Sequence, residues 1–342
     1  MKTLFAWQAL VPPRETSAPA WIRRAALGGA LIALGGGLVQ VGLGMHEGWL
    51  LFFPLAVSAL LFGLPHGAID HLVALGLAGR ALKAGNLLAV VGLYLLLALL
   101  YGGLWLVAPG LALLGFLVMT IYHWGKADTA FDRIRYPEGP LAGNRLLRPI
   151  HTAVRGGLPV GLPLLAFPEQ SADFLRSCLE LFVEGPAPPI ELWRLWVGGI
   201  LSALLAVELC LLWRHRRTEG GRCLLVETGL LLALFWLVPP LAAIGWYFCL
   251  WHGLRHVLRL TRYHAGTSNP GTGARALGLF FRRALPFTLV SLLFLALAGL
   301  ALPTEGSPAH WVALYLVLIS TLTFPHIILV EWMDQKARSR SR

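Results

Sequence analysis

Two histidines lie four residues apart in segment 251–256, WHGLRH, inside a stretch apolar enough to cross a membrane. Residues at this spacing project from one face of a helix, so His252 and His256 can offer two imidazoles to one metal ion. A histidine is costly to place in lipid and is rarely found there without a partner. The pair therefore predicts a metal site within the membrane.

Further histidines occur in other apolar stretches and are candidates for the same site. His66, His123 and His326 each lie in a different stretch, and His151 begins another. His66 and His71 are five residues apart and point to different faces of a helix, so only one of them should join the site. We choose His66, because His71 lies closer to the lipid–water boundary. A single histidine in a membrane is often only a helix–helix hydrogen-bonding residue, but several on different helices favour ligation.

Acidic residues in the same stretches are candidates for orienting the ligands. Asp70 lies one turn after His66 and could accept its second ring N–H, which would fix the tautomer of that histidine. Glu208 and Glu227 also lie in apolar stretches and could orient ligand histidines. The full set of candidates for contacting the ligands from behind, or for lining the pocket, is Asp70, Asp128, Glu208, Glu227 and His326.

The composition indicates a membrane protein. The 342 residues are 57% hydrophobic and 13% charged, with a mean hydropathy of +0.69, whereas a soluble domain carries about 25% charged residues. The formal charge of +11 comes from residues in short loops between apolar stretches, which is the positive-inside pattern rather than a nucleic-acid surface. The four cysteines show no metal-binding spacing and are interpreted as packing residues.

The apolar stretches predict an all-α, polytopic integral membrane protein with about ten transmembrane helices in one bundle. The expected spans are 25–45, 49–75, 86–107, 109–125, 147–167, 190–213, 222–239, 241–262, 283–302 and 309–333. They form a single membrane domain at 25–333, preceded by a lead-in at 1–24 and followed by a basic tail at 334–342. The lead-in lacks the layout of a cleaved signal peptide.

Basic loops alternate with uncharged or acidic loops along these spans. The positive-inside rule then places both termini in the cytoplasm, as an even number of spans requires, and we expect a multi-pass protein of the inner (plasma) membrane. On this topology the histidines of the five-residue set His66, His123, His252, His256 and His326 all lie toward the cytoplasmic side. They are therefore expected to meet at one depth.

Imidazole ligands suit zinc, copper, iron or nickel, so the ligand type does not decide the metal. An all-histidine site in lipid is compatible with non-haem iron that handles an apolar substrate and O₂. A di-iron membrane oxygenase is the nearest competitor, but its HxxHH motif does not occur here. A histidine-lined transporter would need ionisable residues across both halves of the membrane, and a membrane protein with a purely structural metal is a third possibility.

Four motifs resemble the Brp/Blh family of integral membrane carotene oxygenases. They are GLPHGAIDH at 63–71, HWGKAD at 123–128, WHGLRH at 251–256 and FPH at 324–326. Their order and their placement on the predicted spans agree with that family. Gly253 is a departure, because we expect a serine-like residue at this position.

The resemblance implies a β-carotene 15,15′-dioxygenase that uses O₂ to cut the central double bond and releases two molecules of all-trans-retinal. It implies an Fe(II) cofactor held by His66, His123, His252 and His256, with His326 in the pocket or behind the ligands. The implied partners are β-carotene, O₂ and membrane lipids, without nucleic acid. Neither the sequence nor the resemblance gives an oligomeric state.

Overall fold

The computed structural model describes residues 18–45, 48–183, 190–264, 273–301 and 308–340, and all regular structure within them is helical. This confirms the predicted all-α class. Most of the expected lead-in, residues 1–17, and the last two residues of the expected tail lie outside the described residues. The first described helix begins at Ala20, and the last continues through the start of the basic tail to Arg340.

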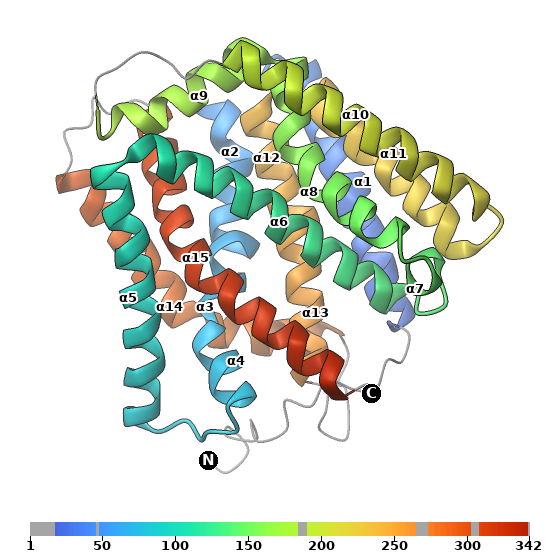
Figure 1. Cartoon of the computed structure of the whole chain (residues 1–342). Coiled ribbons are helices and arrows are strands. Elements are labelled where there is room, and N and C mark those ends of the chain that lie inside the picture. The colour runs from blue at the N-terminus through green and yellow to red at the C-terminus, as the bar shows by residue number, and fades with distance from the viewer. Residues whose placement is uncertain (1–17, 46–47, 184–189, 265–272, 302–307, 341–342) are drawn as a thin grey trace.

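The helical elements follow one another along the chain, and Figure 1 shows their arrangement. They are α1 (Ala20–Gly42), α2 (Gly48–Ser58), η3 (Ala59–Gly63), α3 (Leu64–Ala68), α4 (Asp70–Leu77), α5 (Ala84–Val107), α6 (Pro109–Arg135), α7 (Pro140–Gly143), α8 (Leu147–Ala166), α9 (Pro168–Glu180), α10 (Ile190–Arg214), α11 (Glu219–Leu237), α12 (Pro240–Tyr247), η4 (Phe248–Gly253), α13 (Leu254–His264), α14 (Gly273–Ala301) and α15 (Pro308–Arg340). Helices α6, α9 and α12 begin with a proline. Proline lacks a backbone N–H, and at the first position of a helix that group has no partner within the helix in any case.

Seven helices within the described residues are long and apolar enough to cross a membrane. The pair α8 and α9, bent by 113°, brings the number to eight if it counts as one span. The chain is thus an all-α membrane protein, but the predicted count of about ten spans is not confirmed. Helix α6 and the segment 240–264 are not among the seven, because both carry several charged residues and histidines.

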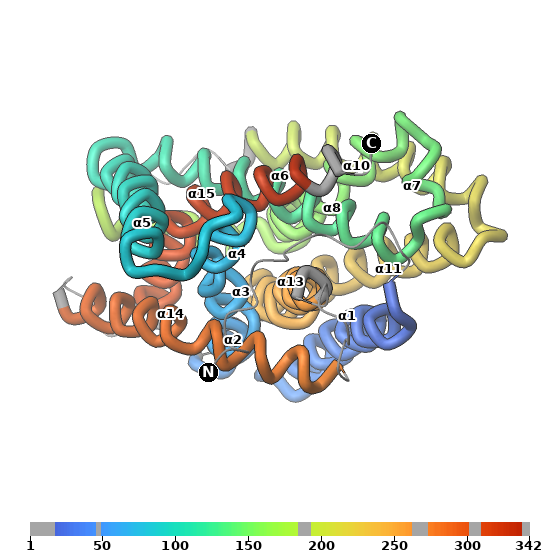
Figure 2. Tube along the Cα trace, turned by 90° about the horizontal axis from the view of Figure 1, so that it is seen from below, coloured from blue at the N-terminus to red at the C-terminus, as the bar shows by residue number. Residues whose placement is uncertain are grey.

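Two broken helical segments lie at the centre of the molecule. One runs through α2, η3, α3 and α4, and the other through α12, η4 and α13. Figure 2 shows both between α1 and α14 on one side and α6 and α15 on the other. The short elements η3 and η4 are π-helical turns, which occur often at functional sites. Each stands in or directly before one of the histidine motifs.

The two π-helical turns pack closely against each other. A Cβ atom added to Gly253 would lie 2.8 Å from the Cβ of Phe62 and 2.7 Å from the carbonyl oxygen of Phe248. Real Cβ atoms essentially never show such distances, so the serine-like residue expected here would not fit without a shift. The glycine therefore permits the close approach of the two segments that carry His66 and His252.

Helices α6 and α8 cross with their backbones nearly in contact. A Cβ at Gly125 would lie 2.0 Å from the carbonyl oxygen of Thr152, and one at Gly156 would lie 1.8 Å from that of Ile121. Only glycine permits this approach. The crossing fixes the position of α6 two residues after His123, so it positions that histidine as well.

Candidate metal centre

Five buried histidines come together at the centre of the bundle. His66 comes from α3, His123 from α6, His252 from η4, His256 from α13 and His326 from α15. The five were expected at one depth, and the structure brings all of them into one cluster. His71 lies outside it, with its ring centroid 4.3 Å from that of Phe287 on α14.

Four of the rings form a closed quadrilateral. In the order His66, His252, His123 and His326, neighbouring ring centroids are 5.6, 5.1, 5.0 and 5.1 Å apart. His256 lies beside one edge of this quadrilateral, 5.2 Å from His66 and 5.3 Å from His326. It is 6.4 Å from both His123 and His252.

These separations fit imidazoles that share one ion. A bound nitrogen lies about 2.1 Å from the metal, so a ring centroid lies about 3.2 Å away, and two such centroids are ~4.6 Å apart at 90° and ~6.5 Å apart at 180°. All eight centroid distances above fall within that range. Nitrogens of His66, His123 and His252 also lie within 4.8 Å of one another.

Several ring nitrogens of the cluster have no hydrogen-bond partner among the described residues. His123 Nε2, both ring nitrogens of His252, His256 Nδ1 and His326 Nε2 are buried without a hydrogen-bond partner there. Buried polar atoms are normally paired, and an exception calls for an explanation such as an ion. One metal ion would take one nitrogen from each ring and so would account for four of these five atoms, and the residues present fit the metal that the sequence predicts.

Hydrogen bonds behind the cluster set the tautomers of two members. His66 Nδ1 donates to the carbonyl oxygen of Phe62 at 2.9 Å, which leaves Nε2 with its lone pair. Asp70 was expected to accept from His66, but it contacts His326 instead, with 2.7 Å between His326 Nδ1 and Asp70 Oδ2. The interpretation of Asp70 as a residue behind a ligand therefore holds only if His326 is one.

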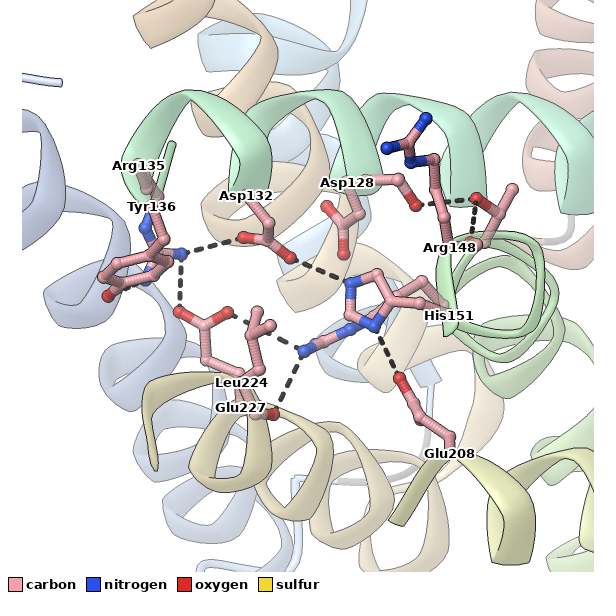
Figure 3. A network of polar contacts seen from close by, with 12 residues as sticks. Asp128, Asp132, Arg135, Tyr136, Arg148, His151, Glu208, Leu224 and Glu227 are labelled. Carbon is pink, nitrogen blue, oxygen red and sulfur yellow. Dashed lines mark hydrogen bonds and ion pairs between the residues drawn. The ribbon is translucent and has the colours of Figure 1, made fainter. Parts of the chain in front are cut away.

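The other acidic candidates belong to a buried polar network beside the cluster (Figure 3). Glu208 lies 2.5 Å from His151 Nδ1, and Glu227 accepts from Arg135 at 2.6 Å and pairs with Arg255 at 3.1 Å. Neither contacts a histidine of the cluster in these interactions, although both were expected to orient candidate ligands. Sequence spacing alone could not have paired them, because their partners come from other helices.

The network pairs buried acidic groups with buried basic groups. It contains four carboxylates and three guanidinium groups, namely Asp128, Asp132, Glu208, Glu227, Arg135, Arg155 and Arg255. Both ring nitrogens of His151 face carboxylates, with Asp132 3.1 Å from Nε2 and Glu208 2.5 Å from Nδ1. The three guanidinium groups and this ring therefore face the four acidic groups of the network.

The network holds the helix that carries two cluster histidines. In segment 251–256, Trp251 and Arg255 face the network, whereas His252 and His256 face the cluster. Trp251 Nε1 donates to Asp128 Oδ2 at 2.8 Å, and the guanidinium of Arg255 lies 3.9 Å from the centroid of the Trp251 ring. Asp128 therefore ties α6 to η4 from behind the histidines.

A cavity of about 850 Å³ opens from the histidine cluster. Its lining is mostly apolar and includes His66, His123, His252 and His326. On α5 it extends from Val90 to Leu106, which is about 24 Å at 1.5 Å per residue. The cavity is thus elongated, and its volume lies at the upper end of the ~300–1,000 Å³ usual for ligand pockets.

Comparison with known proteins agrees with the resemblance seen in the motifs. The family model for β-carotene 15,15′-dioxygenase matches residues 57–334. A protein named probable β-carotene 15,15′-dioxygenase Blh, from Halobacterium salinarum, is 36% identical over 299 residues, which cover 83% of this chain and 84% of that protein. The chain belongs to the β-carotene 15,15′-dioxygenase family.

Two further members of this dioxygenase family are more distant. The probable β-carotene 15,15′-dioxygenase Brp of Halobacterium salinarum is 28% identical over 357 residues, covering 95% of each chain. The β-carotene 15,15′-dioxygenase of an uncultured marine bacterium is 28% identical over 197 residues, covering 57% of this chain and 64% of that protein. No solved structure matches this chain significantly.

Several residues around the centre of this family member were not predicted. His151 was noted only as the start of a span, and the buried arginines Arg135 and Arg155 were not singled out. Buried arginines in apolar helices are a usable signal, because a charge in such a place needs a partner. Tyr94, whose hydroxyl lies 3.1 Å from Asp70 Oδ2, carried no signal in the sequence.

Proposed function

We propose that the chain is a membrane-embedded, Fe(II)-dependent dioxygenase that cleaves the central 15,15′ double bond of β-carotene. One O₂ is consumed, and each carbon of the broken bond takes one oxygen atom, which yields two molecules of all-trans-retinal. The observation that carries the proposal is the buried histidine cluster in the wall of a long apolar cavity. The printed names of the relatives support the same reaction.

The cavity suits a long apolar substrate taken from lipid. β-Carotene is roughly as long as the ~30 Å hydrocarbon core of a bilayer. Several cavity-lining residues of α5 and α14 are also exposed on the outside of the bundle, among them Leu99, Val290 and Phe294. The cavity therefore lies open between these two helices, and we propose that the substrate enters there sideways from the membrane.

The length of the cavity supports cleavage at the central bond. Tyr94 stands next to the cluster through Asp70, and the lining of α5 ends twelve residues later at Leu106. This arm is about 18 Å long at 1.5 Å per residue. Half of a ~30 Å substrate is about 15 Å, so one half of β-carotene fits the arm while the central bond lies at the histidines.

The protein itself holds the ion, positions the polyene and excludes water. His66, His123, His252 and His256 hold the ion as neutral imidazoles, and when bound the iron supplies the activation of dioxygen. The apolar lining keeps water from the polyene and fixes which bond lies beside the ion. The reaction requires no general base or nucleophile from the chain.

We place the chain in the inner (plasma) membrane with both termini in the cytoplasm. The alternation of basic with acidic or uncharged loops supports this orientation. The histidine cluster would then lie toward the cytoplasmic side.

The test is retinoid extraction from β-carotene-accumulating bacteria that express the chain. We expect retinal and loss of carotene with the wild type, and neither with His252→Ala. The matched control is His215→Ala, which changes a histidine in the turn after α10, away from the cluster, and should behave as the wild type. Unchanged carotene in wild-type cells with folded, iron-loaded protein would refute β-carotene as the substrate and direct the search to other lipids.

A further inference from the structure

We propose that His326 is a fifth ligand of the metal ion, held in place by Asp70 and Tyr94. This inference rests on the iron site of the proposed function and extends it beyond the four histidines that the motifs suggested. Its basis is the position, the tautomer and the backing of the His326 ring.

The ring of His326 lies as close to other rings of the cluster as those rings lie to one another. Its centroid lies 5.0 Å from His123, 5.1 Å from His66 and 5.3 Å from His256. It completes the quadrilateral in which His66, His252 and His123 occupy the other corners.

The tautomer of His326 directs a lone pair at the cluster. Nδ1 donates to the carboxylate of Asp70 at 2.7 Å, so Nε2 of the neutral ring carries the lone pair. Nε2 is buried and has no hydrogen-bond partner among the described residues. A proton on Nε2 would have no acceptor among them either, so coordination to a cation is the arrangement that uses this atom.

The backing of His326 resembles that of a metal-bound histidine. Ligand histidines usually donate their other ring N–H to a carboxylate, which fixes the ring and raises its basicity. Asp70 supplies that carboxylate, and Tyr94 holds it, with the hydroxyl 3.1 Å from Asp70 Oδ2 and 3.0 Å from the carbonyl oxygen of Leu322. These contacts join α4, α5 and α15, and together they hold the ring of His326 in place.

The experiment compares iron binding in the purified full-length wild type, His326→Ala, Asp70→Asn and His71→Ala, each loaded with Fe(II) without oxygen. Iron per chain, the rate of iron release to a chelator and the imidazole signal in X-ray absorption are measured. We expect His326→Ala to lose part of the imidazole signal and to release iron on the order of 10–100-fold faster, with a smaller increase for Asp70→Asn. The control His71→Ala should match the wild type.

The outcomes separate this inference from the function on which it rests. Iron release and an imidazole signal in His326→Ala that equal those of the wild type would overturn the fifth ligand and leave the four-histidine site standing. A wild-type chain that binds no iron would overturn both. If His326→Ala does not fold, His326→Gly with added imidazole replaces it, and recovery of the wild-type absorption spectrum with imidazole supports ligation. Failure of imidazole to restore that spectrum in folded protein contradicts it.

Discussion

Shortening the long arm of the cavity should move the cleavage away from the central bond. Gly103 lines this arm on α5, and a Cβ added there would meet no atom within 4 Å. The first carbon of a Gly103→Phe side chain therefore has space, and the ring adds bulk to this arm. From Tyr94 to Gly103 is nine residues, or about 13.5 Å, against about 18 Å to Leu106.

The magnitude follows from the lost length of about 4.5 Å. The shortened arm no longer holds half of a ~30 Å substrate, so the central bond is held back from the histidines. Reacting groups need to lie ~3–3.5 Å apart, and a misplacement of about 1 Å can cost on the order of 100-fold. We expect central cleavage to fall by at least that factor. Affinity should change little, because the substrate exchanges lipid surroundings for protein surroundings of similar polarity.

The assay is chromatographic separation of retinal from longer apocarotenals after incubation of membranes with β-carotene. We expect Gly103→Phe to form less retinal and a larger share of longer products. The matched control is Gly92→Phe on the same helix, where a Cβ also meets nothing within 4 Å, at an exposed position that is not part of the cavity lining. If Gly103→Phe forms only retinal, at a rate within twofold of the wild type, the length of this arm does not select the bond that is cleaved.

Three further predictions concern stability and the metal. Arg255→Met leaves the buried carboxylates of Asp128 and Glu227 short of a cation and should cost about 3–5 kcal/mol of stability, measured as a lower thermal midpoint in detergent. The control Arg23→Met breaks the exposed pair with Glu219 and should cost at most about 1 kcal/mol, so equal midpoints for the two variants would contradict the prediction. Gly253→Ser should lower the stability by about 1–3 kcal/mol through overpacking against Phe62, while the control Gly92→Ser should leave the thermal midpoint unchanged. A Gly253→Ser variant as stable as the wild type would show that the two π-helical turns can separate. Removing the metal with a chelator should abolish retinal formation, Fe(II) but not Zn²⁺ should restore it, and activity that survives in metal-free protein would contradict the role of iron.

The candidate cluster was accessible from the sequence because a histidine in an apolar helix is rare and expensive. That ground selected His66, His123, His252, His256 and His326 as a set expected at one depth, the family resemblance then named the first four as ligands, and the structure brings all five together. His326 was predicted only as a pocket or backing residue, because the resemblance implied ligands from the first three motifs alone. Its partner Asp70 was assigned to His66, which is closer in sequence, whereas the fold brings α15 against α4.

The broken segments at the centre of the molecule show what hydropathy alone does not predict. Residues 109–125 and 241–262 were predicted as spans from their apolar residues. Helix α6 continues past the first of them with charged residues of the network in Figure 3, such as Asp132, and Arg255 of the same network lies within the second. The π-helical turns η3 and η4 leave no signature in hydropathy, because they depend on which backbones approach each other. Gly253 and Gly125 could be located in the sequence, but the helices that pack on them could not.

The most direct test of the account is the stoichiometry of the reaction with purified, iron-loaded protein. Retinal formed, β-carotene lost and O₂ consumed are measured together in the wild type and in His252→Ala. The account predicts two retinal molecules and one O₂ for each β-carotene in the wild type, and no reaction in His252→Ala. Less than one retinal per β-carotene with longer aldehydes beside it, or the same turnover in His252→Ala, would contradict central cleavage at the histidine cluster.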